Sequence, residues 1–135
     1  MKVLTIGTFD LFHAGHAFLL GWAAMFGELH VGVNTDTFVV SYKGKRPALP
    51  IEERAGVIRE LPFVKGVYAN EDHGDTLIRE LAPNLIAIGS DWHTRDYLEQ
   101  IGISQLELDE LEIGVLYIPR KGLASTTRIR EELGC

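Results

Sequence analysis

The stretch KVLTIGTFDLFHAGH, residues 2–16, decides the fold of this chain. Residues 2–6 are rich in apolar and β-branched side chains, which predicts a central strand that stops at Gly7, where turn chemistry begins. Residues 17–26 are apolar nearly all round, which is typical of a helix packed against a sheet. The stretch therefore predicts a strand, a turn and a helix in direct succession.

The rest of the chain repeats this alternation. Strand patterns lie at residues 29–33, 66–69, 85–88 and 114–118, and helical patterns lie at 51–61, 75–81, 96–101 and 126–133. Residues 35–50 predict a short helical piece followed by a basic loop. Strands separated by helices pair in parallel through right-handed crossovers. We predict an α/β fold, a single Rossmann-like doubly wound domain over residues 1–135, with a five-stranded parallel sheet in the order 3-2-1-4-5.

The composition excludes several classes of protein. The formal net charge of −6 argues against a nucleic-acid binder, because such proteins present a basic face to the phosphate backbone. The single cysteine, Cys135, suits a reducing compartment. The longest apolar stretch, residues 17–26, is too short to span a bilayer. We expect a soluble cytoplasmic protein that binds neither nucleic acid nor membrane.

Positive side chains nevertheless gather in two places. Lys43, Lys45 and Arg46 fall within four positions, and a second group near the C-terminus comprises Arg120, Lys121, Arg128 and Arg130. Local affinity for phosphate can therefore coexist with an acidic chain, whose run ELDELE at 107–112 is typical of a solvated face.

Candidate ligand-binding residues directly follow predicted strands, at 7–10, 34–36, 89–92 and 120–127. In doubly wound sheets, ligands bind beyond the carboxyl ends of the strands. Ser125, Thr126 and Thr127 lie at a predicted helix start with Arg128 in its first turn, where hydroxyls and free N–H groups can hold phosphates. Taken alone, such a run is more often a helix cap, and Asp91 can likewise be read as a cap.

His13 and His16 lie three positions apart, so both rings share one face of the first turn of a helix that begins here. Gly15 between them leaves room for a phosphate. Two imidazole donors beside a helix N-terminus would stabilise an oxyanion on phosphorus, which is electrostatic rather than base catalysis. A zinc site or a structural pair are the alternatives, but zinc needs further ligands, and His30, His73 and His93 are scattered.

The motif GTFDLFHAGH, residues 7–16, resembles that of the cytidylyltransferase-like nucleotidyltransferases, and specifically of bacterial glycerol-3-phosphate cytidylyltransferases. The resemblance covers nearly the whole chain. It also takes in the basic loop 43–45, the pair Glu53-Arg54, the segment Gly89-Ser90-Asp91-Trp92, and Arg120 leading into Ser125-Thr126-Thr127.

The resemblance implies a role for each matching position. His13 and His16 would hold the α- and β-phosphates, and Lys43 and Lys45 would close over the phosphates of donor and acceptor, with Arg120 adding charge. Asp10 would lie near the phosphates and Mg²⁺, and Asp91 could accept from the amino group of cytosine. The other expected nucleotide-binding residues are Gly7, Thr8, Phe9, Gly15, Gly89, Trp92, Ser125, Thr126 and Thr127.

The chain departs from the family pattern at two places that concern the acceptor. An arginine of that pattern falls here on Pro62, so its phosphate contact is either lost or supplied by Arg59. The loop RKGLAST at 120–126 has its glycine displaced by one place. The candidates for binding the acceptor or its phosphate are Arg54, Arg59, Lys121 and Arg128.

These residues predict an enzyme that transfers CMP from CTP to a phosphorylated small alcohol, such as glycerol 3-phosphate or a related polyol phosphate, and releases pyrophosphate with Mg²⁺. The alternative within the family is an adenylyltransferase that uses ATP with a sugar, flavin or pantetheine phosphate. A nucleotide-binding module that has lost catalysis is the alternative from another class. The resemblance also implies a homodimer.

Overall fold

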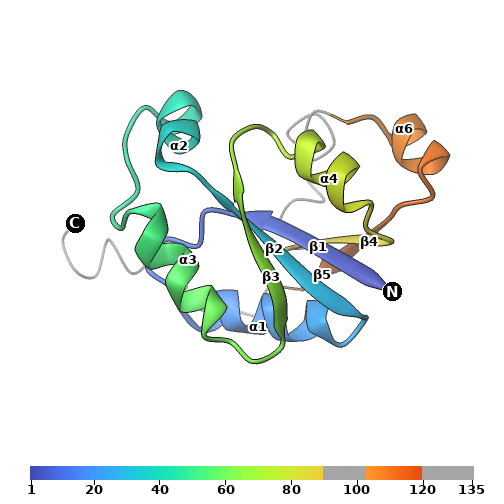
Figure 1. The fold of residues 1–135 in the computed structure, drawn as a ribbon, viewed down its shortest axis with the longest axis horizontal. Coiled ribbons are helices and arrows are strands. Elements are labelled where there is room, and N and C mark those ends of the chain that lie inside the picture. The colour runs from blue at the N-terminus through green and yellow to red at the C-terminus, as the bar shows by residue number, and fades with distance from the viewer. Residues whose placement is uncertain (90–102, 120–135) are drawn as a thin grey trace.

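The computed structural model describes residues 1–89 and 103–119, which form an α/β domain around one parallel sheet (Figure 1). The elements are β1 Lys2–Gly7, α1 Ala14–Ala24, β2 Glu28–Asn34, α2 Asp36–Lys43, α3 Ile51–Arg59, β3 Val64–Asn70, α4 Asp75–Leu81, β4 Leu85–Gly89, α6 Gln105–Glu110 and β5 Gly114–Ile118. The predicted helices at 96–101 and 126–133 lie outside the described residues.

The five strands are ordered β3-β2-β1-β4-β5, and every neighbouring pair is parallel, so the predicted sheet is confirmed. β1 lies at the centre, because the chain adds β2 and β3 on one side of it and then crosses to add β4 and β5 on the other. The order of strands therefore reverses beside β1. In such sheets, this is where a crevice opens beyond the carboxyl ends of the strands.

Helices cover both faces of the sheet, as Figure 1 shows, with α1 and α3 on one face and α4 and α6 on the other. Side chains alternate along β1 between the two layers. Val3 packs into a core with Leu20 and Ile58, whereas Leu4 packs into the opposite core with Ile78 and Leu108. All six of these side chains are fully buried, so β1 contributes side chains to both cores.

Local signals in the sequence explain where two short helices begin and end. Thr35 accepts a hydrogen bond from the N–H of Phe38 and begins α2, and Gly44 ends it in the left-handed conformation at φ 77°. Ser104 caps α6 by accepting from the N–H of Glu107. The acidic run that we expected to be a solvated face lies largely in α6, and it buries Leu108 against the sheet.

Within the described residues, no helix is both long and apolar enough to cross a membrane.

Candidate active site

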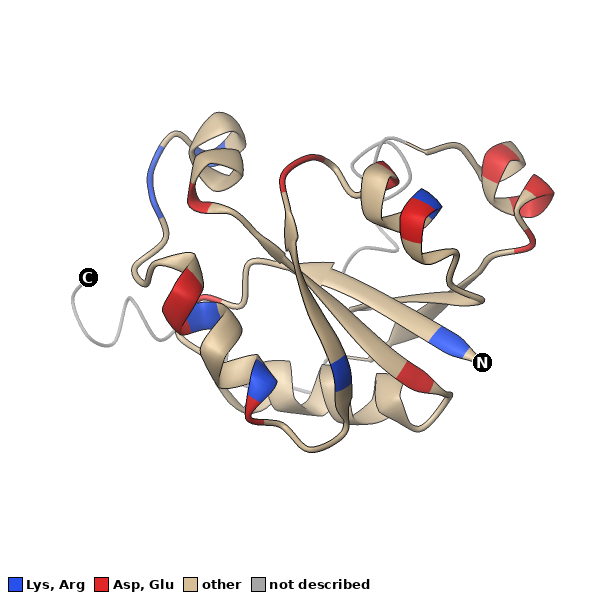
Figure 2. Ribbon diagram, viewed as in Figure 1, with Lys and Arg blue, Asp and Glu red and all other residues tan. Residues whose placement is uncertain are grey.

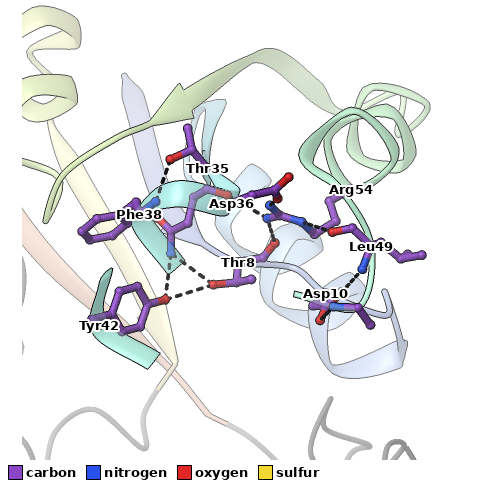
Figure 3. A network of polar contacts seen from close by, with 10 residues as sticks. Thr8, Asp10, Thr35, Asp36, Phe38, Tyr42, Leu49 and Arg54 are labelled. Atoms are coloured by element: carbon purple, nitrogen blue, oxygen red, sulfur yellow. Dashed lines mark hydrogen bonds and ion pairs between the residues drawn. The ribbon is translucent and has the colours of Figure 1, made fainter. Parts of the chain in front are cut away.

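The candidate site lies at the carboxyl ends of β1 and β2, where the chain leaves the sheet towards α1 and α2 (Figure 3). β1 runs into the turn at 8–12, and the two histidines follow at the start of α1. α1 begins at Ala14, earlier than the predicted residue 17, because His13 serves as its N-cap with an extended backbone at φ −143°.

The two histidines cap α1 with their own side chains. The N–H of Gly15 donates to Nδ1 of His13 at 3.0 Å, and the N–H of His13 donates to Nδ1 of His16 at 3.3 Å. The two rings stack with their centroids 3.8 Å apart. This reciprocal arrangement resembles a capping box, with imidazoles in place of the usual hydroxyl and carboxylate.

The capping determines which ring nitrogen carries the proton. A backbone N–H can only donate, so each Nδ1 must accept and carries no hydrogen. In the neutral ring the proton then lies on Nε2, the nitrogen on the far side of the ring from Nδ1. In that tautomer, each histidine carries its ring N–H on Nε2, close to a helix N-terminus that itself favours anions.

Aromatic residues of the preceding turn hold the His16 ring. Its centroid lies 5.4 Å from that of Phe9, edge to face, and 5.4 Å from that of Phe12. Phe9 and Leu11 adopt positive φ values of 52° and 50°. Such backbone costs about 1–3 kcal/mol per residue and persists where the surrounding structure enforces it. The strained turn therefore places the buried Phe9 ring in contact with the ring of His16.

Gly7 leaves the space that Phe9 occupies. A Cβ at this position would lie 3.1 Å from two atoms of the Phe9 ring. We expect Gly7→Ala to displace that ring, to lower stability by about 1–3 kcal/mol, and to reduce activity through His16. Denaturant unfolding and steady-state turnover measure the two effects.

Gly21→Ala on α1 is the matched control, since a Cβ there meets nothing within 4 Å. It should be neutral or stabilise by up to about 1 kcal/mol. A Gly7→Ala protein with unchanged stability and turnover would contradict the proposed contact.

Arg54 on α3 is 1% exposed, and its guanidinium forms hydrogen bonds with several segments around the site. Its Nη1 donates to the carbonyls of Thr8 and Asn34, both at 2.8 Å. Its Nε donates to the carbonyl of Leu49 at 2.8 Å, and its Nη2 pairs with Asp36 at 2.5 Å. We predicted that Arg54 would contact a phosphate or the acceptor. In the described structure, its guanidinium donates hydrogen bonds to these four oxygen atoms.

Asp10 lies at the end of the GTFD turn and is 4% exposed. One carboxylate oxygen accepts from the N–H of Ala48 at 2.7 Å, and the other accepts from the N–H of Leu49 at 3.0 Å (Figure 3). The carboxylate thus faces the segment that leads into α3.

A group of hydroxyl and amide side chains lies beside these residues. Asn34, at the end of β2, donates through Nδ2 to the hydroxyls of Thr8 at 3.2 Å and Tyr42 at 3.4 Å. Those two hydroxyls lie 3.2 Å apart. Asn70, at the end of β3, donates to Oδ1 of Asn34 at 2.8 Å. Neutral polar groups therefore run across the ends of three adjacent strands.

Lys43 is the last residue of α2, and Lys45 and Arg46 lie in the loop between α2 and α3, where Figure 2 shows positive charge well separated from α6. Lys43, Lys45 and Arg46 are exposed, and Nζ of Lys43 lies 5.8 Å from the centre of the Tyr42 ring. Arg59 instead lines a hollow of about 180 Å³ between α3 and β3.

The remaining predicted residues divide into two sets. Gly15 lies in the first turn of α1, and Gly89 ends β4 opposite Ile118 of β5. The other predicted site residues lie outside the described part of the chain: Asp91, Trp92, Arg120, Lys121, Ser125, Thr126, Thr127 and Arg128.

The described residues do not form a metal site of their own. Among residues 1–89 and 103–119, no group of three or more His, Cys, Asp or Glu side chains could hold a metal ion. Both oxygens of Asp10, the residue expected near Mg²⁺, accept backbone N–H groups. In the described structure, the Asp10 carboxylate is thus engaged with the backbone of residues 48 and 49.

Our sequence reasoning did not identify Tyr42 and Asn70 as site residues. Asn34 was indicated by its position directly after a strand, and the same rule applied to Asn70 would have found it. Tyr42 carries no such signal, because only the orientation of α2 brings its hydroxyl to Thr8 and Asn34.

The paired histidines thus lie at the first helix N-terminus, beside the central strand of a parallel sheet whose strand order reverses there. A family model described as cytidylyltransferase-like matches residues 4–132. The chain therefore belongs to the cytidylyltransferase-like family of nucleotidyltransferases.

Curated relatives support this family. The chain is 32% identical to an FAD synthase of Pyrococcus horikoshii, with 98% of this chain and 92% of that protein covered. It is 33% identical to an FAD synthase of Pyrococcus abyssi over 96% of this chain and 89% of that protein. It is also 40% identical to the bifunctional protein HldE of Aliivibrio salmonicida, over 70% of this chain but 20% of that protein.

Solved structures share the fold. The lipopolysaccharide core biosynthesis protein of Thermoplasma volcanium superposes with a TM-score of 0.69 at 28% identity, covering 90% of this chain and 96% of that one. Pantothenate synthetase of Thermus thermophilus has a TM-score of 0.62 at 15% identity, covering 96% of this chain and 61% of that one, and shows likeness of fold alone.

Proposed function

We propose that this protein is an adenylyltransferase that transfers AMP from ATP to the phosphate of a small molecule and releases pyrophosphate. The proposal replaces CTP, our first expectation, with ATP. Its support is the likeness to FAD synthases along nearly the whole chain. FAD is AMP joined to FMN through their phosphates, so a nucleotidyltransferase that makes it transfers an adenylyl group.

The observation that carries the chemistry is the reciprocal capping of α1 by His13 and His16. A phosphate monoester is already an anionic nucleophile, so the reaction needs alignment and charge stabilisation rather than a base. An oxygen of the acceptor phosphate attacks the α-phosphorus, and the bond from that phosphorus to the oxygen bridging to the β-phosphate breaks. The two Nε2–H donors would stabilise the charge on the α-phosphate and the departing pyrophosphate.

Lys43, at the end of α2, and Lys45, in the loop that follows, would neutralise further phosphate charge. Mg²⁺ belongs to this proposal as part of the metal–nucleotide substrate, since Mg²⁺ is commonly bound through substrate phosphates. No step of the reaction is assigned to a metal held by the protein.

The acceptor would lie over the ends of β2 and β3, where the neutral polar groups gather. The hydroxyl oxygens of Thr8 and Tyr42 each accept a hydrogen bond from Nδ2 of Asn34. One of these two hydroxyls also donates its proton to the other. The other hydroxyl proton is then available to a ligand or to solvent. These groups suit an acceptor that carries several hydroxyls, either the ribityl chain of FMN or a sugar phosphate.

A pyrophosphate-release assay with each nucleotide against a panel of acceptors tests the proposal. ATP and CTP would each be paired with FMN, a sugar 1-phosphate and glycerol 3-phosphate. We expect ATP to exceed CTP by about 10²-fold or more in kcat/KM, because a site built for one base leaves its polar groups unpaired with the other. Turnover with CTP alone would restore the cytidylyl reading. Tight nucleotide binding without turnover on any pair would favour a module that has lost catalysis. The homodimer stays a prediction that sedimentation can test.

A further inference from the structure

The segment that carries the cations is attached to the rest of the molecule at both ends. At one end it continues directly from α2, which ends at Lys43, is capped by Gly44 and buries Val39. At the other end, Ala48 and Leu49 are bonded to Asp10. Only Lys45, Arg46 and Pro47 lie between these two attachments in the sequence.

The peptide at Leu49 is held from both sides. Its N–H donates to Asp10, which ends the GTFD turn, and its carbonyl accepts from Nε of Arg54 at 2.8 Å (Figure 3). Arg54 in turn holds the carbonyl of Thr8, in the same turn as Asp10. We call this set of contacts among Thr8, Asp10, Ala48, Leu49 and Arg54 the Leu49 clamp.

The Leu49 clamp is built from strong and buried contacts. Asp10 is 4% exposed and Arg54 is 1% exposed, so neither group depends on solvent for its hydrogen bonds. Hydrogen bonds to an ionised carboxylate are stronger than those between neutral groups. Both oxygens of Asp10 accept from two consecutive backbone N–H groups, an arrangement that asparagine cannot reproduce because its amide nitrogen would face a donor.

We propose that Asp10 is a positioning residue that fixes the basic segment, Lys43, Lys45 and Arg46, relative to the two histidines. Asp10 lies in the turn that leads directly to His13, so its contact with Ala48 and Leu49 sets the distance between the basic segment and the two histidines. This inference rests on the proposed function, and it assigns Asp10 a task other than holding Mg²⁺.

A double-mutant cycle tests this role. In the wild-type background, Asp10→Asn should lower kcat by about 10–100-fold, because displacing charged groups by an ångström costs that much. In a background carrying Lys43→Ala and Lys45→Ala, the same change should cost only about 3-fold or less, because the groups that it positions are gone. The half-saturating Mg²⁺ concentration should not change. Asp109→Asn, at an exposed residue of α6, is the matched control and should leave kcat unchanged.

Several outcomes would overturn the proposal. An equal loss in both backgrounds would mean that Asp10 acts independently of the lysines. A raised Mg²⁺ requirement in Asp10→Asn would mean that Asp10 holds the ion. Full activity of the Lys43→Ala/Lys45→Ala protein would remove the groups that the clamp is proposed to serve.

Hydrogen exchange of the wild-type protein tests the clamp even if Asp10→Asn does not fold or no acceptor supports turnover. The amides of Ala48 and Leu49 should exchange at least about 10-fold more slowly than those of Lys45 and Arg46, after correction for intrinsic rates. Equal rates would overturn the clamp itself. Absence of turnover with normal protection at Ala48 and Leu49 would count against the proposed function and leave the clamp in place.

Discussion

The His16→Ala protein is expected to keep its fold and to lose nucleotidyl transfer by about 10²–10³-fold, the usual cost of removing one donor to a developing oxyanion. The substitution removes the Nε2–H donor, and it also removes the Nδ1 that accepts from the N–H of His13. Loss of that cap should cost only about 0.5–2 kcal/mol of stability. Pyrophosphate release at saturating substrate and denaturant unfolding measure the two effects separately.

His16→Asn is the matched variant, because it separates the cap from the chemistry. An asparagine oxygen can occupy the place of Nδ1 and accept from His13, but the side chain does not extend to the position of Nε2. We expect wild-type stability with the same loss of turnover. If His16→Asn or His16→Ala turned over at the wild-type rate, the assignment of Nε2 as the phosphate donor would be wrong.

Replacing Arg54 by alanine is expected to destabilise the protein by about 3–5 kcal/mol, the cost of breaking a buried ion pair by removing one partner. The change leaves the carbonyls of Thr8, Asn34 and Leu49 without their donor and Asp36 without its partner. Arg54→Lys should recover only part of the loss, because one ammonium cannot reach acceptors spread around a planar guanidinium. Urea unfolding measures both variants.

Arg79→Ala on α4 is the control for Arg54. Arg79 also forms ion pairs, with Asp75 at 3.8 Å and Glu107 at 2.5 Å, but its side chain is 49% exposed. Exposed pairs contribute at most about 1 kcal/mol, so this variant should unfold almost as the wild type does. Equal losses in the free energy of unfolding for the two alanine variants would show that the buried contacts of Arg54 stabilise the protein no more than exposed ion pairs do.

The contribution of the Arg79–Glu107 pair to stability should depend on pH in a direction that follows from the pKa of Glu107. The hydrogen bond from Arg79 is the main cause that holds the pKa of Glu107 below its usual value. A carboxyl whose pKa is lowered by folding stabilises the folded state above its ordinary pKa and loses that contribution as the pH falls through the lowered value. The small effect of Arg79→Ala should therefore vanish in acid.

The sheet was predictable because its signals are local. Runs such as 85–88 and 114–118 are apolar and short, helical patterns separate them, and the handedness of crossovers limits the possible strand orders. The closeness of the two histidines was also predicted from their three-residue spacing, although the structure achieves it with His13 as an extended N-cap rather than as a helical residue. The acidic run at 107–112 is a solvated face as predicted, since residues 109–112 are exposed, but the sequence did not indicate that Leu108 within it packs α6 on the sheet.

The roles of Asp10 and Arg54 could not be predicted from the sequence. Arg54 holds oxygen atoms of Thr8, Asn34, Asp36 and Leu49, which are brought together only when β1, β2 and α3 have packed. A charged residue in a phosphate-binding family is readily interpreted as a ligand contact. The burial of Arg54 adds a structural role, because a guanidinium that is 1% exposed must find acceptors within the protein.

By itself, the sequence determined the alternation of strands and helices, the family motif and the chemical class of the reaction, because each depends on residues that are neighbours along the chain. Tertiary structure alone decided that Asp10 holds a loop, that Arg54 joins four segments, and that Asn34 and Tyr42 share one polar group. Those outcomes depend on which backbone donors and acceptors meet after packing, and hydrogen bonds between distant segments leave no periodic trace in a sequence.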